Sequence, residues 1–296
     1  MKFDSYHPFI NLVYFVMAII FMLNFNHPVF LAIAYFSVFF WSIKLNGKKS
    51  LYFNLCLIPC ILFYTGWYSF YNHFGVTVLG QNFIENQITL ESIVYGFVRG
   101  VVAASIVMEF TCIFAVVTAD KIVYLLGRIS PKLSLFFSIL LRIIPRIGKW
   151  AKKTDLARRG VGRGIGQGNI FQRFIHLIGL ISITITWTME NLVESAASMQ
   201  SRGYSLKGRT AFSIYRFDGR DRGFLIALAA GIMAIFMADA AGETTILYDP
   251  MILIGPVTGV SIICYLVYIT LLSLPLILQI IGEKRFEQLR RESYGE

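Results

Sequence analysis

Six long apolar stretches constrain the fold of this chain more than any other feature of its sequence. Each approaches the length of about 20 residues that a helix needs to cross the hydrocarbon core of a bilayer. The chain is 56% hydrophobic and only 15% charged, and its mean hydropathy is +0.64. We therefore predict an all-α integral membrane protein with about six transmembrane helices. The stretches cover residues 9–22, 28–43, 51–70, 93–119, 224–241 and 251–281.

The distribution of basic residues predicts the orientation of these spans. Eighteen of the 27 Lys and Arg residues lie in 120–223, whereas the segments 71–89 and 242–250 contain none. Loops rich in Lys and Arg stay in the cytoplasm. The pattern predicts a multi-pass protein of the cell membrane with both termini cytoplasmic. It also accounts for the net charge of +10 without a nucleic-acid partner.

The same pattern divides the chain into three predicted segments. Residues 1–119 form the N-terminal transmembrane helices, and residues 224–296 form a C-terminal pair of transmembrane helices with a cytoplasmic tail. Between them, residues 120–223 form a cytoplasmic coupling region. Two long amphipathic helices are predicted in this region, each roughly 40–50 Å long at 1.5 Å per residue. Their charges would not be tolerated by a lone spanning helix, so we expect them to lie along or under the membrane.

Local signals mark where these two helices begin. Ser130-Pro131 is a favourable start, because a hydroxyl can cap the first turn and proline lacks an N–H that would go unused there. Asn169 is a suitable cap for the second helix. Pro145 is expected to kink the first helix or to break it into two pieces.

Each of the two helices is predicted to stop at an arginine followed by a glycine. The pairs are Arg159-Gly160 and Arg202-Gly203. Glycine favours helix ends, and a cation in the last turn suits the helix dipole. A guanidinium at a helix tip can form forked, charge-assisted bonds with a carboxylate of a partner protein. The repeat therefore suggests two docking points, and the alternative is that both arginines bind lipid headgroups.

The residues around these pairs resemble a known signature. The sequences DLARRG at 155–160 and SMQSRGY at 198–204 are similar to the paired Ala-Arg-Gly signatures of the transmembrane T component of energy-coupling factor (ECF) transporters. This family includes the cobalt-transport CbiQ proteins. The order of apolar spans, coupling region, a link at 209–221 and two final spans also resembles the family. The alanine of the signature is replaced by Arg158 and Ser201, so only the Arg-Gly pairs match.

The resemblance implies a non-catalytic subunit with two kinds of partner. It would link two cytoplasmic ABC-type ATPases to a membrane-embedded substrate-binding S component, for uptake of a vitamin or a transition-metal ion. Arg159 and Arg202 would sit in grooves of the ATPases, with Gly160 and Gly203 ending their helices. The resemblance assigns no role to Arg158.

Cofactor motifs are missing from the sequence. No Gly-x-x-x-x-Gly-Lys-Ser/Thr loop occurs, so ATP is expected on the partner subunits and no cofactor is expected in this chain. The four histidines have no metal-ligand spacing, and no metal site is predicted.

Glu109 supports a different functional hypothesis. An ionisable group inside an apolar stretch is a functional candidate, so the chain could instead be an intramembrane enzyme acting on lipid or peptide with Glu109 in its site. The structural interpretation is a carboxyl group that faces other helices and is hydrogen-bonded there. Copurification separates the two functions, because a coupling subunit brings ATPases with it whereas an enzyme is active alone.

Overall fold

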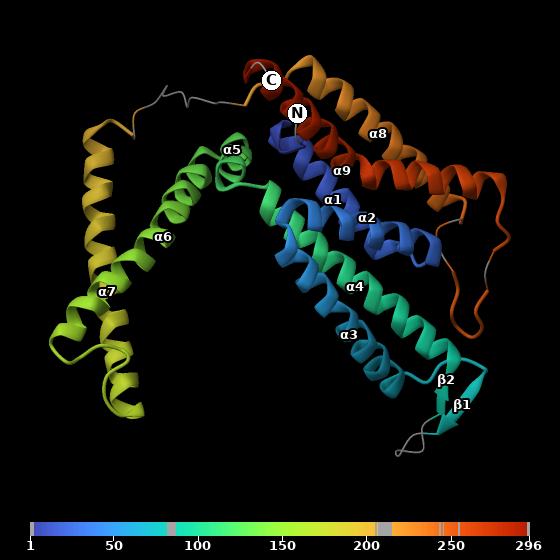
Figure 1. Cartoon of the computed structure of the whole chain (residues 1–296), viewed down its shortest axis with the longest axis horizontal. Helices are drawn as coiled ribbons and strands as arrows, with labels where there is room; N and C mark the ends of the chain where they lie inside the picture. The colour runs from blue at the N-terminus through green and yellow to red at the C-terminus, as the bar shows by residue number, and fades with distance from the viewer. Residues whose placement is uncertain are drawn as a thin grey trace. The chain divides into compact units, whose positions relative to one another are not determined.

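The computed structural model describes residues 3–81, 87–204, 206, 215–242, 244, 246–253 and 255–294, without the side chains of residues 128 and 294. Strands in the described part are limited to one small antiparallel hairpin, and helices make up most of the rest (Figure 1). The prediction of an all-α membrane protein is confirmed. After a short 3-10 helix, Phe3–Ser5, the elements are α1 (Pro8–Asn24), α2 (Pro28–Asn46), α3 (Lys48–Tyr71), β1 (Val78–Gln81), β2 (Gln87–Thr89), α4 (Leu90–Val116), α5 (Ala119–Ile129), α6 (Pro131–Gly160), α7 (Ile170–Ser201), α8 (Gly219–Ala240) and α9 (Gly259–Tyr294).

The set of helices long and apolar enough to cross a membrane differs from the predicted set. Six described helices qualify, namely α2, α3, α4, α7, α8 and α9. Helix α1 is apolar but has only 17 residues, and α7, which we placed in the coupling region, has a sufficiently apolar window. The first 17 residues of α7 contain only Arg173 as a Lys, Arg, Asp or Glu residue, which is why its hydropathy is high.

The chain forms two compact units. One comprises Met1–Thr118 with Tyr215–Glu296, and the other comprises Ala119–Ile214. In the first unit, α4 contacts α1, α2 and α3, while α9 packs against α2 and α8 (Figure 1). The predicted link at 209–221 lies outside the described residues as far as 214, and α8 begins at Gly219 with a capping box between Asp218 and Asp221.

Aromatic side chains fill the core of the first unit. The indole of Trp41 on α2 is 1% exposed and stacks on Phe15, with ring centroids 5.5 Å apart. It meets Phe3 and Tyr14 edge-on at 5.8 and 5.9 Å, a favourable geometry for aromatic pairs. The hydroxyl of Tyr14 donates to the carbonyl oxygen of Leu272 at 3.1 Å, which connects α1 to α9. The core is therefore assembled from segments far apart in the sequence.

Glycines allow α4 to approach α3 closely. A Cβ at Gly96 would lie 3.2 Å from the carbonyl oxygen of Thr65, and one at Gly100 would lie 3.1 Å from Cγ2 of Ile61. The two glycines are four residues apart, the spacing of the Gly-x-x-x-Gly motif that lets membrane helices pack backbone to backbone. This motif is legible in the sequence, but we did not predict the contact.

The connection between α3 and α4 is more ordered than the loop predicted there. Strands β1 and β2 pair antiparallel, with Val78 opposite Thr89 and Gln81 opposite Gln87. The hydroxyl of Thr89 accepts from the N–H of Ser92 at 3.4 Å and so caps α4. The carboxylate of Glu91 accepts from the hydroxyl of Thr77 at 2.6 Å. The hairpin is thereby joined to the first turn of α4.

The second unit contains α5, α6 and α7. Helix α5 was not predicted, and it joins α6 through a hydrogen bond from the hydroxyl of Ser134 to the carbonyl oxygen of Val123 at 2.9 Å. Helix α6 begins at Pro131, as predicted, and continues through Pro145 without a break. Helix α7 begins after Asn169, whose side chain takes part in a capping box with Gln172. Both predicted helix starts are therefore confirmed in position, but the hydroxyl of Ser130 forms no cap hydrogen bond, so the predicted hydroxyl cap of α6 is wrong.

Candidate functional site

The turn between α6 and α7 carries the first Arg-Gly pair. Helix α6 ends in a Schellman motif, in which the N–H of Gly162 donates to the carbonyl oxygen of Arg159 at 3.1 Å and the N–H of Arg163 donates to that of Arg158 at 2.9 Å. Gly162 has a φ of 74°, in the left-handed region that glycine adopts without strain. The turn is therefore a defined helix cap.

Arg159 forms an ion pair within its own helix. Its Nε and Nη2 lie 2.8 and 2.7 Å from Oδ2 of Asp155, one helical turn earlier. The other carboxylate oxygen, Oδ1, accepts from the N–H of Ile165 in the turn at 3.0 Å. Asp155 is buried, whereas the side chain of Arg159 is 58% exposed. The pair thus anchors the guanidinium at its buried edge while most of the side chain faces outward.

The hydrogen bonds of Asp155 also change its acidity. The N–H of Ile165 holds the pKa of the Asp155 carboxyl below its usual range, against the opposing effect of burial, and the cations Arg159 and Arg158 act in the same direction as the N–H. The carboxylate is therefore ionised at neutral pH, as the ion pair requires.

Arg158 joins α6 to α7. Its Nη1 donates to the carbonyl oxygen of His176 at 2.9 Å, and its guanidinium lies against Gly179, where a Cβ would be 3.0 Å from Nη2. The ring of His176 bonds back to the carbonyl oxygen of Gly164 through Nδ1 at 3.1 Å. The two adjacent arginines therefore differ in role. Arg158 connects α6 to α7, whereas the side chain of Arg159 lies at the surface.

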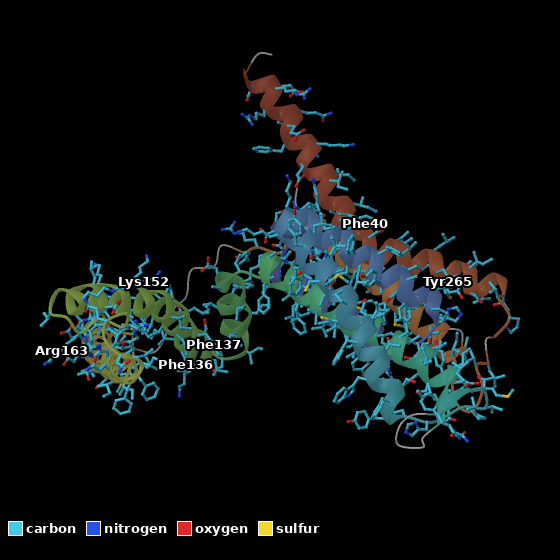
Figure 2. The ribbon with its side chains drawn as sticks, turned by 60° about the horizontal axis from the view of Figure 1, so that its bottom comes forward. Phe40, Phe136, Phe137, Lys152, Arg163 and Tyr265 are labelled. Carbon is cyan, nitrogen blue, oxygen red and sulfur yellow. The ribbon has the colours of Figure 1, made fainter. Side chains whose placement is uncertain are left out.

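Stacked indoles mark where α6 and α7 cross. The rings of Trp150 and Trp187 lie 3.9 Å apart with an interplanar angle of 29°. The ammonium of Lys153 lies 5.5 Å from the centre of the Trp150 ring, within the range of a cation–π contact. In Figure 2, Lys152 marks the last third of α6 and Arg163 the turn that follows it, and Phe136 and Phe137 mark its first turns. The turn with Arg159 therefore lies beyond the crossing.

The second Arg-Gly pair ends α7. Here the N–H of Gly203 donates to the carbonyl oxygen of Gln200 at 3.0 Å, and the N–H of Tyr204 donates to that of Met199 at 3.2 Å. Gly203 has a φ of 73°, and a Cβ there would lie 2.9 Å from Cδ1 of Leu206. The helix therefore closes in a second Schellman motif, with the exposed Arg202 as its cap residue.

The two pairs occupy different positions in their caps. Gly203 is the left-handed residue that ends α7, as predicted. Gly160 is the last residue of α6, but the left-handed position belongs to Gly162, two residues later. Arg159 consequently stands inside the last turn, whereas Arg202 stands just after it. The sequence repeat does not reveal this shift, because additional glycines follow Gly160 and each was a possible stop.

The structure does not bring Arg159 and Arg202 together. Arg158, the neighbour of Arg159, bonds to the backbone of His176 near the start of α7, and Arg202 follows its last residue. The 26 residue steps from His176 to Arg202 correspond to about 40 Å of helix. Figure 1 shows the end of α6 beside the start of α7, with the end of α7 far from both. The unit therefore presents two separate tips.

The difference between the two glycines can be tested by substitution. Gly203→Ala should destabilise the end of α7 by about 1 kcal/mol, because alanine is strained at positive φ and its Cβ would press on Leu206. Gly160→Ala should be neutral or stabilise the helix by up to about 1 kcal/mol, because Gly160 is helical and a Cβ would meet no atom within 4 Å. Thermal unfolding in detergent, with hydrogen exchange at the helix ends, measures both. Equal losses would contradict the assigned caps.

Apolar side chains surround the first tip. Four of the most exposed apolar residues in this region lie around the turn, namely Leu156, Val161, Ile170 and Phe171, which are 70 to 83% exposed. An exposed apolar patch rimmed by polar groups is typical of an interaction site for protein or membrane. We did not predict this patch, although apolar residues close to Arg159 and Arg163 in the sequence could have indicated it.

Glu109 has an enclosed position. Its side chain is 0% exposed within the first unit, which agrees with a carboxyl that faces other helices. Neither carboxylate oxygen has a hydrogen-bond partner among the described residues. The expectation that this carboxyl group is hydrogen-bonded to neighbouring helices is therefore wrong. Within the described ranges, no group of three or more His, Cys, Asp or Glu residues could hold a metal ion.

The fold and these two helix tips define a multi-pass membrane protein with a separate helical unit that ends in two exposed arginines. No family model matches the sequence. A stretch of 91 residues, 30% of the chain, is 32% identical to the energy-coupling factor transporter transmembrane protein EcfT of Lacticaseibacillus paracasei. The chain spans about a third (34%) of the length of that curated relative. Over this stretch the chain is similar to a membrane component of an ECF transporter.

Proposed function

We propose that this chain is the transmembrane coupling subunit of an ECF-type ABC importer. The observation that carries the proposal is the pair of exposed arginines, Arg159 and Arg202, on two capped helix ends about 40 Å apart. Such a spacing suits two separate docking points, one on each of two ATPase subunits. The similarity to EcfT supports the same assignment.

In this proposal each subunit has a distinct task. Two ABC-type ATPases bind ATP in the cytoplasm, and residues 120–223 of this chain form the coupling region that contacts them. A separate S component in the membrane binds the substrate, a vitamin or a transition-metal ion. This chain is non-catalytic and binds no cofactor, and both of its termini are cytoplasmic.

The proposed mechanism transmits motion through α6 and α7. Closing of the ATPase pair on ATP would displace the two tips relative to each other, and the Trp150–Trp187 contact would transmit the displacement from one helix to the other. Exposed apolar residues of α7, including Ile178, Ile181 and Ile185, would contact the bilayer or the S component. Their movement would tilt the S component so that its site faces the cytoplasm.

Copurification from membranes tests this function. The tagged wild-type chain should retain two ATP-binding subunits and a small membrane protein, and the variant with Arg159→Glu and Arg202→Glu should lose the ATPases. The matched control is Arg142→Glu with Lys149→Glu, which reverses two exposed charges on the body of α6 and should retain the ATPases. Mass spectrometry identifies the retained proteins.

The outcomes separate the hypotheses. Loss of the ATPases in the tip variant alone supports coupling through the arginines, and the retained membrane protein identifies the substrate. Failure of the wild type to retain any ATPase contradicts the proposal and favours arginines that bind lipid headgroups. The alternative of an intramembrane enzyme is not favoured by the position of Glu109, because its fully buried side chain offers no surface to a substrate.

A further inference from the structure

The side chain of Arg159 is held from several directions. Asp155 binds its Nε and Nη2, and a Cβ at Gly164 would collide with its Cγ, so the aliphatic stem lies directly on the backbone of the turn. A long surface arginine is normally free to adopt many rotamers, and these contacts remove much of that freedom.

The geometry of the ion pair leaves one edge of the guanidinium available. An arginine side chain has five N–H donors in a planar fork, and Asp155 takes the edge formed by Nε and Nη2. Within the part of the chain that the structure describes, no acceptor is bonded to Nη1 of Arg159. The end formed by Nη1 and Nη2 can therefore donate two hydrogen bonds to a second carboxylate in a forked arrangement.

Asp155 does more than pair with Arg159. Through Oδ1 it also fixes the N–H of Ile165, and so it connects the last turn of α6 with the loop that supports the stem of Arg159. The carboxylate is buried, so water competes weakly for it. The same residue thus sets both the direction of the guanidinium and the position of its support.

We propose that Asp155 is the positioning residue of the first docking tip, orienting Arg159 so that its outer edge meets a carboxylate of the docking partner. Because an oriented side chain has already lost its rotamer freedom, docking requires less ordering of the tip. This inference rests on the proposed function, since it assigns a role to Asp155 at the tip where an ATPase would bind. At the second tip the arginine occupies a different position in its cap, and the last turn of α7 does not contain Asp155.

A double-mutant cycle tests the role of Asp155. The four proteins are wild type, Asp155→Ala, Arg159→Ala and the double variant, and the dissociation constant for the copurifying ATPases is measured in detergent. Asp155→Ala should weaken binding by about 3- to 10-fold, the effect of releasing one rotamer-rich side chain. It should have no further effect when Arg159 is already alanine, because its contribution acts through Arg159.

Conservative variants separate positioning from folding of the turn. Asn at position 155 keeps an acceptor for the N–H of Ile165 but loses the charge that holds Arg159, so Asp155→Asn should weaken binding nearly as much as alanine. Asp155→Glu keeps the charge and should recover part of the affinity. Asp120→Asn, the same chemical change at an exposed residue of the second unit, should leave binding unchanged.

The results distinguish failure of this inference from failure of the proposed function. If Arg159→Ala binds the ATPases as well as the wild type, the proposed function is wrong at this tip. If Arg159→Ala weakens binding but Asp155→Ala does not, or weakens it equally with and without Arg159, Asp155 is not a positioning residue. If Asp155→Asn binds the ATPases as tightly as the wild type, the role of Asp155 is limited to folding of the turn.

Discussion

Reversing the charge at either helix tip should weaken ATPase binding by about 30-fold or more. Each arginine is expected to meet a carboxylate of its partner, and truncating one side of a buried charge pair typically costs about 2–5 kcal/mol. About 2 kcal/mol corresponds to a factor of about 30 in the dissociation constant. Replacement by glutamate adds repulsion to this loss, so Arg159→Glu and Arg202→Glu should each reach at least that factor.

The distance between the tips predicts how the two losses combine. Sites separated by about 40 Å share no contacts, and their effects on free energy should therefore add. Binding of the purified chain to the ATPases, measured by titration at several salt concentrations, gives the single and double effects. Arg159→Lys should bind more weakly than wild type although the charge is retained, because lysine cannot form the forked contact. Equal affinity of the lysine variant would argue against a forked carboxylate contact.

Replacing Trp41 by alanine should give the largest loss of stability in the first unit. The indole is 1% exposed and packs against Phe3, Tyr14 and Phe15, so its removal leaves a cavity lined by aromatic rings. Its Nε1 has no hydrogen-bond partner among the described residues, and hence no hydrogen bond is lost. We expect a loss of about 2–4 kcal/mol, below the upper values for soluble cores because apolar surface gains less when its surroundings are lipid.

The adjacent residue provides a matched control. Phe40 precedes Trp41 on α2, but its side chain is 56% exposed and it is labelled on that helix in Figure 2. Phe40→Ala removes an aromatic ring from the surface and should change stability by less than about 1 kcal/mol. Unfolding in mixed detergent micelles compares the two variants. Similar losses for Phe40 and Trp41 would contradict the assigned core.

Patterns local in the sequence were the ones that could be predicted. Runs of apolar residues gave the helices of the first unit, because a backbone in lipid must satisfy its hydrogen bonds internally and helices do so within one segment. The starts of α6 and α7 followed from Pro131 in the first turn and from the cap residue Asn169, since both signals depend on residues a few positions apart. The Arg-Gly pairs were visible for the same reason.

Features that depend on contacts between segments could not be predicted in this way. The role of Arg158 required the carbonyl oxygen of His176, which is 18 residues away on another helix. The spacing of Asp155 and Arg159 was legible, because residues four apart meet on a helix face. The hydrogen bond from the N–H of Ile165 to Asp155, which makes Asp155 a support of the turn, could not be predicted from the sequence. It depends on how the loop folds back.

The sequence by itself thus determined the class of fold, the helix starts and the two arginines that we propose as docking points, because each is expressed in neighbouring residues. Only the tertiary structure decided that Gly162 rather than Gly160 takes the left-handed position, that the two arginines stand about 40 Å apart, and that Asp155 orients one of them. The physical reason is that cap geometry, helix crossing and side-chain direction are set by packing and hydrogen bonds between segments, and many sequences with the same local pattern allow several solutions.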